Sequence, residues 1–244
     1  MQISTRFRQC LDTPSASLAD AALAELGNGD VKPLVDLLES FFRPMPIRAV
    51  KFSNKDTLRT TLESFWFRPN EHHCVAEMCL LADPKAKYGD GRYRFVDIFI
   101  PGSPHVPCLE LKSASLVGLW RGEGGQDDGR ADQLQQLQEK LNGEAEAELL
   151  RRKVKYRGDG GNGWYEKTIN EMKESGFQQI KGYLDIIKRG KTDGQHPGVL
   201  DSRICCGQGS SDLHGYLVIC IGATRVLAWQ VSDQQSDYLF EAIK

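Results

Sequence analysis

The sequence lacks the features that define several large protein classes. No apolar run approaches the roughly 18–20 residues that a membrane-spanning helix needs, and residues 1–22 hold no continuous apolar stretch like that of a secretory signal. Of 244 residues, 24 are glycine and 10 are proline, without a three-residue period. We therefore expect neither a membrane protein, nor a secreted protein, nor a collagen-like chain.

The seven cysteines form no C-x-x-C pair, and their number is odd. Both observations, together with the absence of a predicted signal, indicate reduced thiols and an intracellular protein, in either the cytoplasm or the nucleus. The phosphate-binding pattern GxxxxGK[ST] is also missing, so nothing indicates a nucleoside triphosphatase.

The composition is that of a globular protein, with 40% hydrophobic and 26% charged residues, and we expect a single domain over residues 1–244. The net charge is only −2, but it is unevenly distributed. Residues 151–191 contain eleven Lys and Arg against five Asp and Glu, a balance of +6, which leaves −8 for the rest. This asymmetry indicates either a surface for a polyanion or an ordinary solvated helix.

The periodicity of the apolar residues predicts an α/β protein. Helices are expected over residues 16–27, 31–42, 55–66, 130–156 and 164–189, with a last helix from Ser236. Strands are expected over residues 73–82, 92–100, 107–112, 215–221 and 224–231. The first three strands follow one another through short connections, so this half of a mixed sheet should be antiparallel.

Two segments extend the expected core. Residues 1–48 form an N-terminal helical extension, and residues 120–160 form a helical insertion bounded by glycine-rich stretches. The leucines of the 130–156 helix are nearly heptad-spaced, so this helix is a candidate contact for a partner protein or for a homo-oligomer. The last residues, DYLFEAIK, resemble an interrupted helix, and we expect the chain to belong to a longer protein.

Three charged residues interrupt otherwise apolar predicted strands: Asp97, Glu110 and Lys112. If the hairpin between these strands is centred on Ser103-Pro104, Asp97 lies directly opposite Glu110. Side chains alternate along a strand, so Lys112 shares the face of Glu110. The opposite face would then be apolar and carry Val96, Ile98, Ile100, Leu109 and Leu111.

Two carboxylates facing each other in a buried sheet repel, and a hard dication such as Mg²⁺ relieves that repulsion. Such an ion also lowers the pKa of a bound water, while a neighbouring lysine orients the water or stabilises charge on a phosphate. This pattern predicts a site for metal-assisted hydrolysis. The alternative is a structural carboxylate–lysine pair on a half-exposed strand face, in an unrelated α/β domain.

The spacing of Asp97 from Glu110-Leu111-Lys112 resembles the signature of the PD-(D/E)xK nuclease superfamily. The predicted order αβββαβ is similar to the core of that superfamily, and Gln179 and Tyr183 resemble its Q-x-x-x-Y element. The likeness is closest to nuclease-like domains that often accompany an AAA-ATPase-like domain, in which a Gly-Arg strand bears the aspartate, as Gly91-Arg92 does here. It covers roughly residues 20–231 without the insertion.

The resemblance implies roles for these residues. Asp97, Glu110 and the Leu111 carbonyl would bind Mg²⁺ or Mn²⁺, and Lys112 would position the attacking water or stabilise the transition state. Gln179 and Tyr183 would support the site or touch the nucleic-acid backbone. The implied activity is hydrolysis of phosphodiester bonds, with DNA favoured over RNA as the substrate.

The sequence departs from the superfamily pattern at two points. Val96 stands where the signature has proline. The acidic residue expected on the helix before the strands has three candidates, Asp56, Glu63 and Glu77, of which Glu63 is preferred because it is the helix residue nearer the first strand.

Four basic residues near the end of the insertion are candidates for phosphate contacts: Arg151, Arg152, Lys153 and Lys155. Their other interpretation is a favourable interaction with the dipole at a helix C-terminus. Two functions thus remain open for the chain. It is a metal-dependent nuclease, or it is a catalytically silent module of the same fold that binds nucleic acid or protein.

Overall fold

The structure is a computed structural model, and it describes residues 14–68, 71–72, 74–102, 104–157 and 163–243. The helices are α2 (Pro14–Gly27), α3 (Lys32–Phe42), α4 (Ile47–Val50), α5 (Lys55–Trp66), α6 (Leu116–Gly122), α7 (Ala131–Gly143), α8 (Glu146–Leu149) and α9 (Ile169–Ile187). The strands are β1 (Phe67–Arg68), β2 (Glu71–His72), β3 (Val75–Leu81), β4 (Tyr93–Phe99), β5 (His105–Ala114), β6 (Lys153–Arg157), β7 (Trp164–Thr168), β8 (Gly198–Val199), β9 (Ile204–Ile221) and β10 (Arg225–Ala242).

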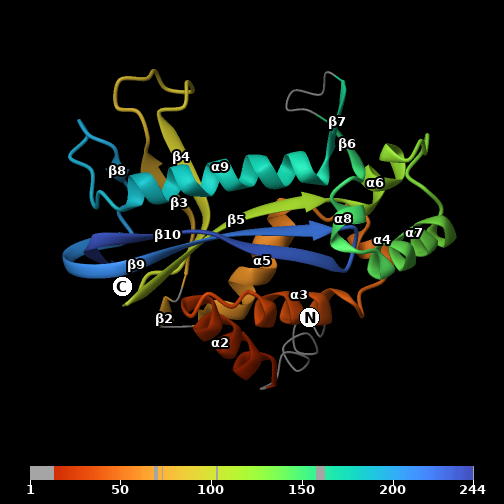
Figure 1. Cartoon of the computed structure of the whole chain (residues 1–244), viewed down its shortest axis with the longest axis horizontal. Helices are drawn as coiled ribbons and strands as arrows, with labels where there is room; N and C mark the ends of the chain where they lie inside the picture. Colours follow the sequence, from red (N-terminus) through yellow and green to blue (C-terminus); the bar gives the residue numbers. More distant parts are fainter. Residues whose placement is uncertain (1–13, 69–70, 73, 103, 158–162, 244) are drawn as a thin grey trace, which may run out of the picture.

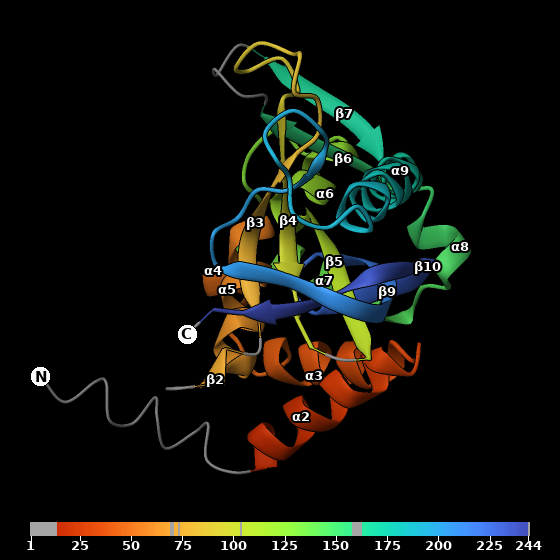
Figure 2. The same ribbon diagram turned by 90° about the vertical axis from the view of Figure 1, so that its left-hand side faces the viewer.

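A six-stranded mixed sheet in the order β10-β9-β5-β4-β3-β8 forms the centre of the fold. The segment β3-β4-β5 is antiparallel, β5 runs parallel to β9, and β9 and β10 form a long antiparallel hairpin. The predicted α/β class, with an antiparallel first half of a mixed sheet, is therefore confirmed. The sheet separates α9 on one face from α2, α3 and α5 on the other (Figures 1 and 2).

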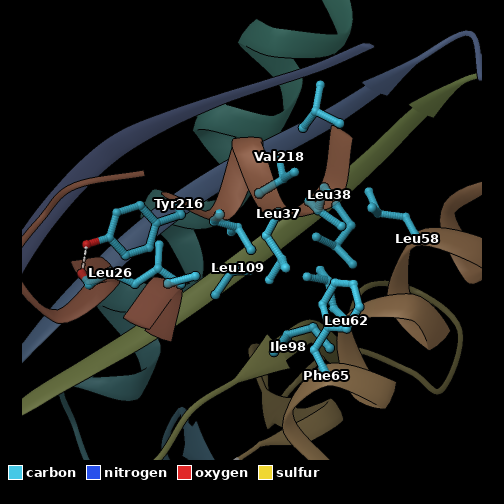
Figure 3. Close-up of a cluster of buried hydrophobic side chains, with 14 of the residues drawn as sticks. Leu26, Leu37, Leu38, Leu58, Leu62, Phe65, Ile98, Leu109, Tyr216 and Val218 are labelled. Atoms are coloured by element: carbon cyan, nitrogen blue, oxygen red, sulfur yellow. Dashed lines mark hydrogen bonds between the residues drawn. The ribbon is translucent and has the colours of Figure 1, made fainter. Parts of the chain in front are cut away.

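The face under α2, α3 and α5 holds one hydrophobic core. Leucines of all three helices pack on β4, β5 and β9 there, and Tyr216 of β9 donates its hydroxyl hydrogen bond to the Leu26 carbonyl oxygen (Figure 3). The expected stripe of α5, Leu58, Leu62, Phe65 and Trp66, is buried throughout. Amphipathic spacing alone therefore predicted which side of this helix meets the sheet.

The other face is covered by α9, whose predicted stripe is also buried: Ile169, Met172, Gly176, Ile180, Leu184 and Ile187. Thr168 is the N-cap of this helix: its hydroxyl accepts the N–H of Glu171, while the Glu171 carboxylate accepts the N–H of Thr168. This capping box ends β7 and begins α9. The predicted helix over 164–189 is thus a strand followed by a shorter helix.

The single helix expected over 130–156 is wrong. Helix α7 ends at Gly143, α8 is a separate turn, and residues 153–157 form β6, which pairs with β7. The segment Lys-Val-Lys-Tyr-Arg alternates polar and apolar residues, which is the period of a strand. The near-heptad spacing of the leucines suggested one continuous helix. Leu134, Leu137, Leu141 and Leu149 are indeed all buried, but they lie on two separate helices.

The helix expected from Ser236 is also wrong, since β10 continues to Ala242. Its last residues pair with 204–208, a segment that showed no strand signal of its own. Phe240 packs in the core under α9 against Phe99 of β4. Pairing with β9 therefore outweighs the local helical pattern. Strand β5 begins at His105 and not near Pro107, because Pro107 pairs within the parallel ladder with His214.

No helix in the part of the chain that the structure describes is long and apolar enough to cross a bilayer.

Two glycines bring α6 against the β6 backbone. A β-carbon on Gly118 would lie 2.8 Å from the Lys155 carbonyl oxygen, and one on Gly122 would overlap the carbonyl oxygen of Lys153. Only glycine permits this approach, because the obstructing atoms belong to the backbone and cannot rotate away. The pair of glycines therefore positions the β6–β7 hairpin on the body of the protein.

We expect Gly122→Ala to destabilise the fold by about 1–3 kcal/mol, because the new methyl group displaces the β6 backbone. Thermal unfolding followed by circular dichroism measures this change. The matched control is Gly143→Ala, where no atom lies within 4 Å of the added carbon and where we expect a change within about 0.5 kcal/mol. Equal stability of the two variants would contradict the close approach.

Candidate functional site

The predicted hairpin register is confirmed. Strand β4 pairs with β5 through Ile98 with Leu109 and Phe99 with Cys108, which places Asp97 opposite Glu110. Both carboxylates are buried, with 2% of Asp97 and 1% of Glu110 exposed. The turn residue Ser103 itself lies outside the described residues.

The two strands separate at Asp97. In the described strands their pairing ends at Ile98 and Leu109, and Oδ2 of Asp97 accepts the Leu111 N–H over 2.8 Å. The side chain of Asp97 thus replaces a ladder hydrogen bond. The sequence analysis placed Val96 on the apolar face opposite the carboxylates, and this prediction is wrong. Because the alternation of side chains is interrupted at Asp97, Val96 packs in the core under α9. The other expected members of that face, Ile98, Ile100, Leu109 and Leu111, do pack against α2, α3 and α5.

A lysine that the sequence analysis missed holds the second oxygen of Asp97. The ammonium of Lys55, the first residue of α5, lies 2.5 Å from Asp97 Oδ1. Lys55 lies 42 residues before Asp97 in the sequence, and no local pattern marks it. Asp97 therefore has both oxygens engaged, one by a backbone N–H and one by a cation.

Glu110 has a separate partner on its own strand. Lys112 lies two residues on, and its Nζ is 2.7 Å from Glu110 Oε1. The same ammonium contacts Oε1 of Gln179 on α9. The structure therefore joins Glu110, Lys112 and Gln179 through direct contacts, as the sequence predicted for a single site.

The electrostatic environment favours protonation of Glu110. Burial raises its pKa, the nearby charge of Asp97 raises it further, and the cations of Lys112 and Lys55 oppose the rise. Burial also raises the pKa of Tyr183, one turn along α9 from Gln179, with smaller contributions from Glu110 and Asp97. Tyr183 thus faces the carboxylate pair, and its hydroxyl stays protonated at neutral pH.

The residues present fit a hard dication. Oε2 of Glu110 is buried and accepts no hydrogen bond from the described atoms, although a carboxylate oxygen in a protein interior needs a partner. The N–H and C=O of one strand residue point to the same neighbouring strand, so the Leu111 carbonyl faces the same gap as its N–H, toward Asp97. Carboxylate and carbonyl oxygens are the ligands that Mg²⁺ and Mn²⁺ take.

The third carboxylate is not brought to this pair. Asp56, Glu63 and Glu77 all contact Arg59 of α5, at 3.1 Å for Asp56 and 3.8 Å for Glu63. Among the described residues no three His, Cys, Asp or Glu side chains gather as a metal site. The candidates for the acidic residue before the strands therefore surround a guanidinium that the sequence analysis did not single out.

Glu77 also has an unusual backbone. Its φ of 49° lies in the left-handed region, where non-glycine residues are strained. In the β3–β4 register it stands opposite Asp97, and its flanking pairs are Ala76 with Ile98 and Met78 with Val96. The strain therefore lies beside the site, at the point where β4 loses its regular alternation.

The four basic residues predicted to contact phosphate separate into two groups. Arg152 is largely buried between Glu123 and Glu144, and burial lowers its pKa. Its guanidinium joins the C-terminal ends of α6 and α7 through these two glutamates, so it is not available to a ligand. Arg151 is exposed, and Lys153 and Lys155 lie on β6, where Glu166 pairs with them at 2.8 and 3.8 Å.

Comparison of the chain with protein-family models, with curated proteins and with solved structures found no match.

The pair of Glu110 and Lys112 can be tested by its effect on stability. We expect Lys112→Met to cost about 3–5 kcal/mol at neutral pH, because it leaves a buried carboxylate without its cation. Adding Glu110→Gln to this variant should restore most of the loss, which a double-mutant cycle of urea unfolding measures.

The pH dependence of the Lys112→Met variant provides a second test. An unpaired Glu110 has a pKa above that of the unfolded chain, so its contribution to stability is full at low pH and is lost as the pH rises through the folded pKa. The deficit against the wild type should therefore shrink as the pH falls from 7 toward 5. A deficit that is independent of pH and unaffected by Glu110→Gln would contradict the pairing.

Proposed function

We propose that this chain is a metal-dependent nuclease that hydrolyses phosphodiester bonds of nucleic acid, with DNA favoured, on a PD-(D/E)xK-like αβββαβ core. The observation that carries the proposal is the cluster at the β4–β5 separation. Two facing buried carboxylates, a lysine on one of them and a glutamine from α9 converge there. The element order α5-β3-β4-β5-α9-β9 supports the same proposal.

Each side chain has a role in this proposal. Asp97, Glu110 and the Leu111 carbonyl would hold Mg²⁺ or Mn²⁺. The bound ion would lower the pKa of a water and offset negative charge on the scissile phosphate. Lys112, held by Glu110 and Gln179, orients the water or stabilises charge that develops on the phosphate. Gln179 and Tyr183 position Lys112 and Glu110 from the α9 side.

One observation favours the second candidate, a catalytically silent module on the same fold. Lys55 already compensates the charge of Asp97, and Lys112 that of Glu110. Both oxygens of Asp97 are engaged, one by Lys55 and one by the Leu111 N–H. A site neutralised by its own lysines needs no ion for stability. In this candidate the fold binds nucleic acid or a partner protein and the carboxylates are structural.

Cleavage of labelled DNA and RNA in Mg²⁺ or Mn²⁺ tests the proposal. We expect ion-dependent cleavage that Lys112→Ala or Asp97→Ala reduces at least about 100-fold, because each removes a charge needed in the transition state. The matched control is Lys181→Ala, which removes an exposed lysine of α9 and should leave the cleavage rate unchanged. Wild-type protein that leaves every polynucleotide intact with either ion would refute the enzyme.

Lys55 separates the two candidates. An ion bound to Asp97 Oδ1 must displace the Lys55 ammonium, so we expect Lys55→Ala to bind Mn²⁺ about tenfold more tightly than the wild type. Isothermal titration without nucleic acid measures this affinity, with Lys181→Ala again as the control. Absence of Mn²⁺ binding in both the wild type and Lys55→Ala would favour the silent module.

A further inference from the structure

We infer that the cavity beside Lys112 receives one unpaired nucleotide, and that this protein acts on single-stranded or frayed nucleic acid in preference to intact duplex. The inference rests on the proposed function, because it names the substrate of that same site. The chemistry that would recognise such a ligand is a phosphate on lysine and a base on an aromatic ring.

The cavity has a volume of about 300 Å³ and adjoins the carboxylate cluster. Leu111 and Lys112 of β5 form part of its lining, together with Lys55, the lysine that contacts Asp97. The segment before α5 and the β6–β7 hairpin supply the other sides. A group bound here would therefore lie beside three residues of the proposed site, Lys55, Leu111 and Lys112.

The charged side chains that line the cavity are all basic. Four lysines contribute to the lining, Lys55, Lys112, Lys155 and Lys167, and among the described lining residues there is no carboxylate. Two of these lysines are paired with the buried carboxylates, Lys55 with Asp97 and Lys112 with Glu110. Glu166 lies 3.8 Å from Lys155, but its shorter contact of 2.8 Å is to Lys153 outside the cavity. The positive charge of Lys155 and Lys167 on the wall of this cavity suits a phosphodiester.

Two aromatic rings that the core does not use line the same cavity. Phe52 is 56% exposed and Tyr156 is 39% exposed. Each ring lies under a lysine, with Lys51 Nζ 4.8 Å from the Phe52 centroid and Lys167 Nζ 4.8 Å from the Tyr156 centroid. The ring of Tyr156 also stacks on Tyr165, with the centroids 5.9 Å apart. Exposed aromatic rings beside basic side chains are typical of single-strand binding sites, where bases stack on the rings.

The size of the cavity argues for an unpaired nucleotide. A volume of about 300 Å³ lies at the lower end of the range for small-molecule pockets, which suits one nucleotide and not a helix of stacked pairs. A base inside a duplex already stacks on its neighbours and is paired, so it offers no face to Phe52 or Tyr156 without being unstacked. The aromatic rings are therefore useful only to a single strand.

A second cavity extends the path of such a strand. It has a volume of about 700 Å³ and is lined by Arg48, Lys51 and Arg130 among others, with Asp132 as its acidic member. Lys51 lines this cavity while its ammonium lies over Phe52 of the first one. The two cavities are thus adjacent, and the backbone of a strand that enters the first can continue along basic residues into the second.

Fluorescence anisotropy in EDTA tests the inference without any cleavage. The probes are labelled oligothymidylate and oligouridylate of about 12 nucleotides, within the ~4–16 nucleotides that single-strand sites span, and a blunt duplex of equal length. We expect the single strands to bind at least about tenfold more tightly than the duplex. The ratio between the two single strands distinguishes DNA from RNA.

The variants Phe52→Ala and Tyr156→Ala should each weaken single-strand binding about tenfold and leave duplex binding unchanged. Both rings are exposed, so neither substitution should unfold the protein, and a thermal unfolding measurement checks this. Tyr88→Ala, which removes a ring that is 88% exposed outside the cavity, is the matched control and should bind as the wild type does. Lys155→Gln with Lys167→Gln should lower both affinity and its salt dependence.

Equal binding of single strands and duplex, or aromatic variants that bind like the wild type, would overturn the inference. These results are separable from the cleavage assay. Tight single-strand binding in EDTA with no cleavage in Mn²⁺ would leave this site standing while the nuclease proposal fails. Cleavage of duplex at the same rate as single strands, unaffected by Phe52→Ala, would leave the nuclease and remove the nucleotide site.

Discussion

The compensation of two buried carboxylates is the constraint on which the site depends. Asp97 and Glu110 face each other with almost no exposure to water, where two negative charges are costly unless cations or hydrogen bonds balance them. The fold supplies Lys55 from α5, Lys112 from β5 and the N–H of Leu111. Lys112 and the Leu111 N–H belong to the same strand, whereas Lys55 comes from a helix packed on the sheet, so the pair depends on the packing of α5 against β4 and β5.

The same constraint explains why β4 and β5 separate. Asp97 takes the N–H that a continuous ladder would use, and this opens the sheet at the point where Lys112, Leu111 and Gln179 meet. At this separation Oε2 of Glu110 is buried and has no hydrogen-bond partner among the described atoms. The basic and aromatic cavity adjoins Lys112 because glycines of α6 bring the β6–β7 hairpin close to the core. Charge compensation, strand geometry and access to a ligand are therefore linked.

Much of this fold follows from local patterns. The stripes of α5 and α9 were predicted from spacing, and the β4–β5 register followed from the position of one turn, because each depends on residues close in sequence. The features that the sequence did not predict are long-range contacts or depend on strand pairing. Nothing local shows that Lys55 reaches Asp97, or that the last residues of β10 pair with 204–208.

The residues of the candidate site also separate into those that local patterns predicted and those that they did not. Asp97, Glu110, Lys112 and Gln179 were brought together as expected, since two strands and one helix face determine their positions. Glu63 went to Arg59 and Arg152 to two glutamates, because a charged side chain takes the nearest opposite charge that folding provides. The spacing of four residues on α5 allows the pair of Glu63 with Arg59, whereas nothing in the sequence indicates the two partners of Arg152.

A crystal structure of the protein with Mn²⁺, recorded at a wavelength that reveals the ion by its anomalous scattering, tests the central claim most directly. We expect a peak between the Asp97 and Glu110 carboxylates and the Leu111 carbonyl, with the Lys55 ammonium displaced from Asp97. Lys55 still bound to Asp97, with no anomalous peak at the pair, would contradict the claim and leave the four charges as a structural cluster.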